Sequence, residues 1–278
     1  MIKVGATVKS KNLLVHFFLI FFVLITLGPF LWMIFTSFKT FEESIRLPIT
    51  ILPQEWYAGA YPNVWGRFPF LSFYFNTFVV LIITVVLQVF ISSLAAYAFA
   101  RLEFPFKNAL FVAALALLMV PGQIFLIPHF QIMVDLNLTN TLTALWLPRI
   151  FGVFGTFLLR QFFMTLPKSL DEAARIDGCN FFQIYLLILM PLMKPAIISL
   201  AIITGLNSWR ELLWPLIINT SPDRLTLSAG LAMLIGEHTT VWPHVMAAST
   251  LAVWPMIILF FFFQRQFIEG IAITGTKD

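Results

Sequence analysis

The densest group of polar side chains in this sequence lies inside an apolar run. Asn207, Ser208, Trp209, Arg210 and Glu211 follow one another between two strongly apolar stretches. An ionised side chain at the middle of a bilayer costs roughly 2.5–3.5 kcal/mol on the insertion scale, so two together require polar surroundings. Adjacent residues point about 100° apart on a helix, so Arg210 and Glu211 are poorly placed to neutralise each other.

The spacing within this group indicates a binding surface. Asn207 and Glu211 share a helix face, and Trp214 lies one turn beyond Arg210 on its face. A polar cavity lined by aromatic rings would suit a sugar, and a cation there would favour an anionic or heavily hydroxylated solute. The alternative is a structural ion pair with a neighbouring helix or a second subunit. Pro215 is expected to bend the helix just beyond the group.

A second polar group, between Leu170 and Pro195, predicts a short helix, a turn and a second helix. Ser169 or Asp171 could cap the first helix, Gly178 should stop it, and the second should start near Phe181. Small side chains and flanking charges at its centre would form a flat patch for docking on another protein, although any cytoplasmic loop needs charges and a helix breaker. The candidate docking residues are Asp171, Glu172, Ala173, Ala174, Arg175, Asp177 and Gly178.

Catalytic and metal-binding patterns are not found in the sequence. The four histidines, His16, His129, His238 and His244, are scattered and lack zinc-binding spacing. There is no Gly-x-Ser-x-Gly elbow for an acyl-enzyme and no Gly-x-x-x-x-Gly-Lys-Ser/Thr loop for nucleotide phosphates. We therefore expect no catalytic residue, no metal ion and no cofactor in this chain.

The composition requires these groups to be held by membrane helices. The chain is 60% hydrophobic and 11% charged, whereas soluble proteins average roughly 25% charged residues. We predict an all-α integral membrane protein of one domain, 1–278. Its six spans are expected at about 13–38, 73–100, 108–134, 142–163, 194–219 and 244–263.

The basic residues predict the orientation of the spans. They cluster in the amino terminus, the 101–107 loop, the 160–194 stretch and the tail, so both termini should be cytoplasmic. They are topology signals and contacts for anionic lipid, and nucleic-acid binding is not expected. In the second span, Ser92, Ala96 and Ala100 recur every four residues, which lets another helix approach closely. Four prolines between residues 40 and 71 should prevent one long helix there.

One spacing resembles a known family signature. Glu172-Ala173-Ala174, three residues, Gly178, nine residues and Ile188-Leu189-Met190-Pro191 are similar to the coupling loop of permease subunits from binding-protein-dependent ABC importers. Met190 stands where the family usually has Leu. Further similar stretches, including 93–102, 121–123 and 157–163, point to the six-span maltose/multiple-sugar type of the carbohydrate-uptake branch.

The resemblance implies a transport role and several partners. The segment 168–191 would sit in a cleft of a cytoplasmic ATPase, and two ATPase subunits would bind ATP and Mg²⁺. A second, homologous permease and an extracytoplasmic solute-binding protein would complete an importer in the cytoplasmic (inner) membrane. The implied function is import of a sugar, oligosaccharide or sugar-phosphate-like solute, along a pathway that includes Asn207, Trp209, Arg210, Glu211 and Trp214.

One residue departs from the family pattern, and one alternative function remains. Relatives commonly have Asn or another polar residue where Arg210 stands, which leaves the charge of the solute open. The alternative function is a self-contained secondary transporter of a polar solute. Such transporters usually show inverted repeats with paired broken helices, and the sequence shows none that we recognise.

Overall fold

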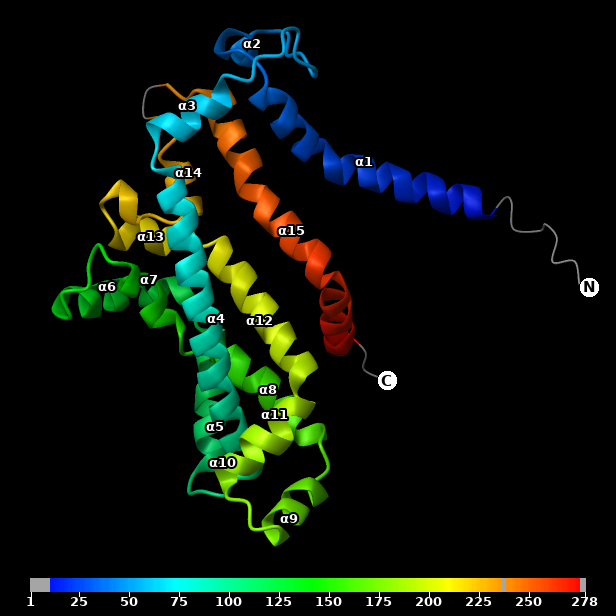
Figure 1. The fold of residues 1–278 in the computed structure, drawn as a ribbon, viewed down its shortest axis with the longest axis vertical. Helices are drawn as coiled ribbons and strands as arrows, with labels where there is room; N and C mark the ends of the chain where they lie inside the picture. Colours follow the sequence, from blue (N-terminus) through cyan, green and yellow to red (C-terminus); the bar gives the residue numbers. More distant parts are fainter. Residues whose placement is uncertain (1–10, 237–238, 276–278) are drawn as a thin grey trace, which may run out of the picture. The chain divides into compact units, whose positions relative to one another are not determined.

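The structure is a computed structural model that describes residues 11–236 and 239–275, with side chains described from 15 to 264. Helices and connecting loops make up this described part, which contains no strand, as the composition predicts (Figure 1). The chain divides into two compact units. Unit 1 comprises Met1–Phe68 and Met233–Trp254, and unit 2 comprises Pro69–Ala232 and Pro255–Asp278.

Unit 1 holds the long first helix and the loop that follows it. The helix α1 (Lys11–Ser37) carries exposed apolar side chains along most of its length, as expected of a helix that faces lipid. The next segment is broken into α2 (Phe41–Ile45) and α3 (Ala60–Arg67), which confirms that its prolines prevent one long helix. Ser37 Oγ and Tyr61 Oη lie 2.8 Å apart and join α1 to α3.

Unit 2 is built around the helix α4 (Phe70–Arg101). The helices α8 (Val153–Thr165) and α12 (Lys194–Trp209) pack along it (Figure 1). The remaining α-helices that lie wholly in unit 2 are α5 (Lys107–Ala116), α6 (Leu126–Asp135), α7 (Leu142–Trp146), α9 (Ser169–Ile176), α10 (Phe181–Gln183), α11 (Met190–Leu192), α13 (Leu213–Ile218) and α14 (Leu227–Ala232). The helix α15 (Trp242–Gly275) is divided between the two units.

Short 3₁₀ and π segments connect several of these helices. The 3₁₀ turns are η1 (Leu117–Met119), η2 (Gly122–Phe125), η3 (Leu147–Arg149) and η5 (Pro222–Arg224), and η4 (Ile184–Leu189) is a π-helix.

The predicted small-residue face of α4 is where α8 approaches. Ser92 Oγ donates a hydrogen bond of 3.3 Å to the Gly152 carbonyl. A Cβ atom placed on Gly155 would lie 2.7 Å from Ser92 Oγ, so a larger residue would force the Ser92 side chain to shift. The small side chains of this face therefore serve packing between two helices of the same subunit.

Three of the predicted spans are not continuous helices. The run 108–134 bends by 98° between Lys107–Met119 and Gly122–Asp135. The run 142–163 bends by 44° between Leu142–Arg149 and Val153–Thr165. Each bend falls at a proline or glycine, where a backbone hydrogen bond is missing or a side chain gives no support.

The predicted fifth span, 194–219, also differs from the structure. Its helix α12 stops at Trp209, and the chain turns through residues 210–212 before α13 begins. The bend expected at Pro215 is therefore wrong in position, because the break lies within the polar group itself. Pro215 is buried in α13, near the start of that helix, where its missing N–H costs no hydrogen bond.

Length and composition leave the number of spans between three and six. In the described residues, three helices are long and apolar enough to cross a membrane, and up to six segments qualify if each bent pair is one span. The terminal residues 1–10 and 276–278, on which the predicted orientation partly rests, lie outside the described part, as does His238.

Candidate functional site

The predicted docking helix exists as α9, and a buried ion pair attaches it to the end of α4. Asp171 is only 9% exposed, and its carboxylate lies 3.4 Å from Arg101 Nε. Arg101 also donates a hydrogen bond of 2.8 Å to the carbonyl of Leu166, just before α9. The helix begins after Lys168 without a side-chain cap, so the caps predicted for Ser169 and Asp171 are not formed. Asp171 holds the helix in place.

The helix α9 ends at Gly178, as predicted. Gly178 has φ +80°, a left-handed conformation that L residues other than glycine rarely adopt. Its N–H donates to the Arg175 carbonyl at 3.0 Å, and the Cys179 N–H donates to the Ala174 carbonyl at 2.9 Å. These two bonds form a Schellman motif, which fixes the direction in which the chain leaves α9.

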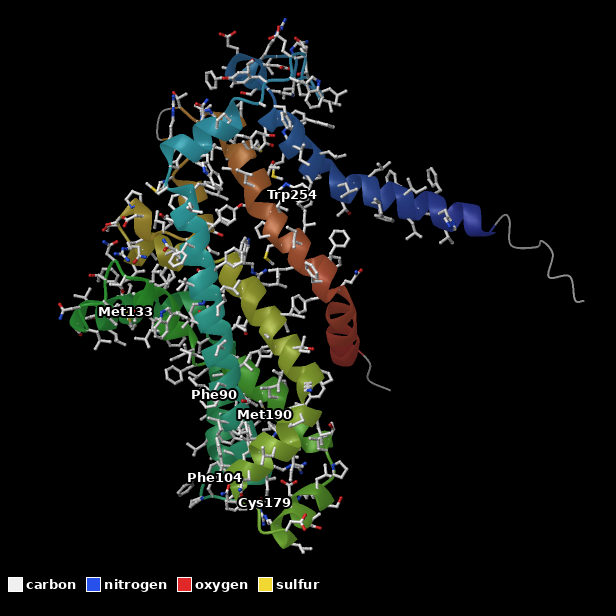
Figure 2. All side chains as sticks on the ribbon, in the orientation of Figure 1. Phe90, Phe104, Met133, Cys179, Met190 and Trp254 are labelled. Carbon is white, nitrogen blue, oxygen red and sulfur yellow. The ribbon has the colours of Figure 1, made fainter. Side chains whose placement is uncertain are left out.

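The chain then enters a second helical stretch, as predicted. Asn180 and Gln183 form a reciprocal capping box that starts α10. The π-helix η4 continues it, with Tyr185 buried and its hydroxyl 2.7 Å from Ser93 Oγ of α4. Cys179, at the start of this stretch (Figure 2), is partly buried and packs against the core of unit 2.

Burial separates the candidate docking residues into two faces. Glu172, Ala173, Arg175, Asp177 and Gly178 are exposed. Ala174 is 3% exposed and packs in the core around Phe163 and Tyr185, and Asp171 is buried as described. The expected flat patch of Ala173 with Ala174 is therefore not formed, because neighbouring positions on a helix face different directions. The neighbouring Ile176 is 87% exposed and belongs to the outward face instead.

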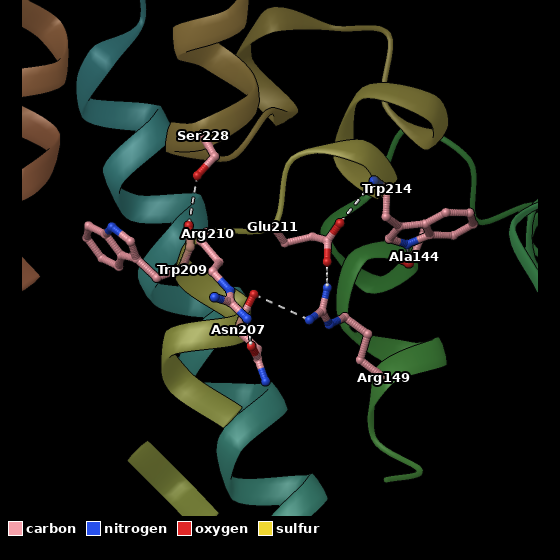
Figure 3. A network of polar contacts seen from close by, with 8 residues as sticks. All are labelled: Ala144, Arg149, Asn207, Trp209, Arg210, Glu211, Trp214 and Ser228. Carbon is pink, nitrogen blue, oxygen red and sulfur yellow. Dashed lines mark hydrogen bonds and ion pairs between the residues drawn. The ribbon is translucent and has the colours of Figure 1, made fainter. Parts of the chain in front are cut away.

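The second candidate site is a polar network around residues 207–214 (Figure 3). Glu211 forms an ion pair with Arg149, which comes from η3 between α7 and α8. Arg149 Nη2 also donates to the Asn207 carbonyl at 3.4 Å, and Glu211 Oε1 accepts from the Trp214 N–H at 3.3 Å. The alternative of an ion pair with a neighbouring element therefore holds for Glu211.

Arg210 has a different environment from Glu211. Its guanidinium donates a hydrogen bond of 2.6 Å to Asn207 Oδ1, a neutral acceptor (Figure 3). No acidic side chain in the described part of the chain lies within ion-pair distance of Arg210. As the sequence predicts, Arg210 and Glu211 do not neutralise each other.

A cavity of about 490 Å³ adjoins this network. Asn207, Glu211 and Trp214 line it, whereas Arg210 lines a neighbouring cavity of about 380 Å³. Trp209, also predicted for the pathway, lines neither. It is 8% exposed, and its ring lies 5.4 Å from that of Phe78, so it is a packing residue in this structure.

Sequence reasoning missed five polar residues that line the larger cavity, Gln88, Gln123, His129, Arg149 and Thr204. A polar residue within the apolar run 73–100 was a usable signal for Gln88, and the Pro-Gly break was one for Gln123. The pairing of Arg149 with Glu211, 62 residues apart, had no local signal. Among the described residues no group of three or more His, Cys, Asp or Glu side chains could hold a metal ion.

The arrangement is that of a helical membrane transport component, and comparison with known proteins gives its family. Residues 88–272 match the family described as binding-protein-dependent transport system inner membrane component. The chain is 37% identical over 260 residues to the arabinooligosaccharides transport system permease protein AraQ of Halalkalibacterium halodurans, covering 92% of this chain and 93% of that protein. The chain belongs to this family.

Two further similarities agree. The chain is 33% identical over 275 residues to the sn-glycerol-3-phosphate transport system permease protein UgpE of Yersinia enterocolitica, covering 95% of this chain and 96% of that protein. The fold is also that of a chain in the crystal structure of a bacterial ABC transporter involved in the import of the acidic polysaccharide alginate. The TM-score is 0.81 at 21% identity, over 95% of this chain and 99% of that one.

Family membership fixes the general role of the chain. It is a multi-pass inner-membrane permease subunit of an ABC importer of the carbohydrate-uptake type, as the loop signature indicated. It is a transport component without an ATPase site of its own, and it works with ATPase and solute-binding protein subunits.

Proposed function

We propose that this permease imports a sugar, oligosaccharide or sugar-phosphate-like solute by alternating access, and that α9 transmits the movement of a partner ATPase. One observation carries the coupling role. The helix α9 is attached to α4 by the buried Arg101–Asp171 pair while Glu172, Arg175 and Asp177 are exposed on it. A helix with one face anchored in its own subunit and one charged face free is suited to move the spans when a partner pulls on it.

The proposed assembly contains this chain, a second homologous permease, two ATPase subunits that bind ATP and Mg²⁺, and an extracytoplasmic solute-binding protein. The bent segments 107–135 and 142–165 would each make one crossing, and α12 with the chain that follows it would make another. Together with the three long helices this gives six spans and places both termini and the segment 168–191 in the cytoplasm. The cluster of basic side chains near this segment supports that side. This chain would need no cofactor of its own.

The solute is proposed to pass the cavity beside the polar network. Amide, guanidinium and carboxylate groups of Gln88, Arg149 and Glu211 offer the donors and acceptors that hydroxyl groups need. The ring of Trp214 adds an aromatic surface for the C–H face of a sugar. The names of the relatives mention an arabinooligosaccharide and a glycerol phosphate, so they support a carbohydrate-like solute and leave its charge open.

Co-purification in mild detergent with a charge-reversed surface tests the coupling role. The variant Glu172→Arg changes the exposed face of α9, and Glu103→Arg is the matched control, because the Glu103 side chain is 90% exposed in the 102–106 loop. We expect mass spectrometry to find an ATPase and a second permease with wild type and with Glu103→Arg. The ATPase should be lost, by tenfold or more, from Glu172→Arg. A wild-type protein that purifies alone and moves solute in liposomes without ATP would instead be a secondary transporter.

A further inference from the structure

The two arginines that line the cavities, Arg149 and Arg210, differ in whether an acidic side chain neutralises their charge. Arg149 is paired with the carboxylate of Glu211, so together they contribute no net charge. Among the described residues, the guanidinium of Arg210 has the amide oxygen of Asn207 as its partner, at 2.6 Å, and Arg210 is exposed. The described lining of the two cavities therefore carries one cation, Arg210, that no acidic side chain among the described residues balances.

The position of Arg210 makes this charge effective. The helix α12 has 16 residues, so Arg210 lies about 24 Å along the helix axis from Lys194. In the proposed six-span topology Lys194 lies at the cytoplasmic boundary of a hydrocarbon core about 30 Å thick, which places Arg210 within the outer part of that core, where charges are screened less than in water. Leaving a guanidinium there without an anion is unfavourable, because the medium cannot solvate it well.

The geometry of Arg210 also suits an anion better than a hydroxyl group. A guanidinium presents several N–H donors in a plane, and one of them is used by Asn207. Arg210 lines a cavity of about 380 Å³ together with Leu212, Leu213, Asn207 and the paired side chains of Arg149 and Glu211. A carboxylate or a phosphate accepts two parallel hydrogen bonds from such a group, and the ionic bonds are stronger than those of a neutral hydroxyl.

We propose that Arg210 is an anion-recognising residue of the solute pathway, and that the solute is a carbohydrate bearing a carboxylate or phosphate group. This inference rests on the proposed import function and names the substrate class of the same site. Asn207 holds the guanidinium toward the cavity, and Glu211 keeps Arg149 from competing for the anion.

Reaction rates of an engineered cysteine measure the charge at this site without any solute. Leu213 is 52% exposed and lines both cavities, so Leu213→Cys in a Cys179→Ser background reports on them. The complex, co-purified as above, is treated with methanethiosulfonates that carry either a sulfonate or a trimethylammonium group. We expect the anionic reagent to react faster, and Arg210→Gln to lower the ratio of the two rates about fivefold.

Two variants separate Arg210 from its neighbour. The double variant Arg149→Gln/Glu211→Gln removes a neutral pair and should leave the rate ratio within twofold of its starting value, and Arg210→Lys should retain the preference. A ratio that Arg210→Gln leaves unchanged would overturn the proposal, for example because a second permease supplies a carboxylate to Arg210. Co-purification of the ATPase with wild type and its loss from Glu172→Arg test the proposed import function, whereas the thiol reaction rates test Arg210. Failure of the import function can therefore be distinguished from failure of the Arg210 proposal.

Protection of the thiol in the Leu213→Cys variant tests the class of solute. The probes are trigalacturonate and its fully methyl-esterified form, which share a framework and differ in charge. With Arg210 present, trigalacturonate should protect this thiol at concentrations at least tenfold lower than the ester, and with Arg210→Gln the two should be equal. Equal protection, or no protection, by the two compounds when Arg210 is present would show that the solute is not an acidic carbohydrate of this kind.

Discussion

At the scale of single residues, the polar network shows how this chain keeps charged groups inside an apolar environment. The Arg149 and Glu211 side chains are 25% and 29% exposed, so water screens their attraction only partly. Glu211 also accepts the Trp214 N–H at the start of α13. This pair joins the η3 turn to the break after α12, two places where the backbone leaves a regular helix.

Removing one partner of this pair should destabilise the protein more than removing both. Glu211→Gln leaves Arg149 without an anion, and we expect a loss of about 1–2 kcal/mol in the free energy of unfolding. The double variant Arg149→Gln/Glu211→Gln should recover at least half of that loss. Thermal unfolding in detergent, followed by tryptophan fluorescence, measures both.

The exposed pair Asp223–Arg224 serves as the control for this comparison. Its atoms are 3.6 Å apart and the Arg224 and Asp223 side chains are 51% and 63% exposed, so Asp223→Asn should change stability by less than about 0.5 kcal/mol. If the double variant lost as much stability as Glu211→Gln or more, the idea of a mutually neutralised pair would have to be abandoned.

At the scale of the elements, the orientation of α9 is set by contacts with residues outside its own segment. The segment 171–178 predicts a short helix with a glycine stop, because capping and left-handed geometry are local properties. Which of its residues face inward depends on Arg101, 70 positions before Asp171 and on another helix. The burial of Asp171 and Ala174 could therefore not be predicted from the sequence.

The membrane spans also combine features that the local sequence predicts with features that depend on tertiary packing. Their positions follow from apolar runs, and the described helices overlap all six predicted ranges. The 98° and 44° bends are not predicted by hydrophobicity, because a lipid-facing stretch is equally apolar whether it is straight or broken. Pro121, Pro148 and Gly152 mark where bending was allowed, but the direction of each bend is fixed by tertiary packing.

Neutralising Asp171 should release α9 from α4 while the exposed face of α9 stays the same. The variant Asp171→Asn leaves Arg101, whose side chain is 5% exposed, without an anion, and the expected loss of stability is about 3 kcal/mol. Hydrogen exchange of residues 169–176 should accelerate at least tenfold, and less ATPase should co-purify.

Glu103→Gln is the matched control for that variant. Glu103 pairs with Lys107 at 3.3 Å near the same end of α4, but its side chain is 90% exposed, so stability and exchange should stay near wild type. Unchanged exchange in α9 of Asp171→Asn would mean that the Schellman end and core contacts of Ala174 suffice to hold the helix.

At the scale of the whole molecule, the proposed transport mechanism depends on how the broken segments cross the membrane. A bent segment such as 107–135 either passes through once with a kink or enters and leaves on the same side, and both fit its length. The proposed six-span topology requires a single passage. It then follows that the loops before and after this segment lie on opposite sides of the membrane, as do residues 46–52 and the segment 168–191.

Single cysteines in a Cys179→Ser background decide between these topologies. Phe106 and Leu136 flank the bent segment and are 81% and 53% exposed, and Leu47 and Ile176 are 80% and 87% exposed in the two reference loops. With a membrane-impermeant maleimide on intact cells or spheroplasts, we expect Leu47→Cys and Leu136→Cys to react from outside. Phe106→Cys and Ile176→Cys should react only after permeabilisation, because six spans place them in the cytoplasm with both termini. If Phe106→Cys and Leu136→Cys instead reacted from the same side, residues 107–135 would be a re-entrant loop, and an even number of spans would then require another segment to change its crossing as well.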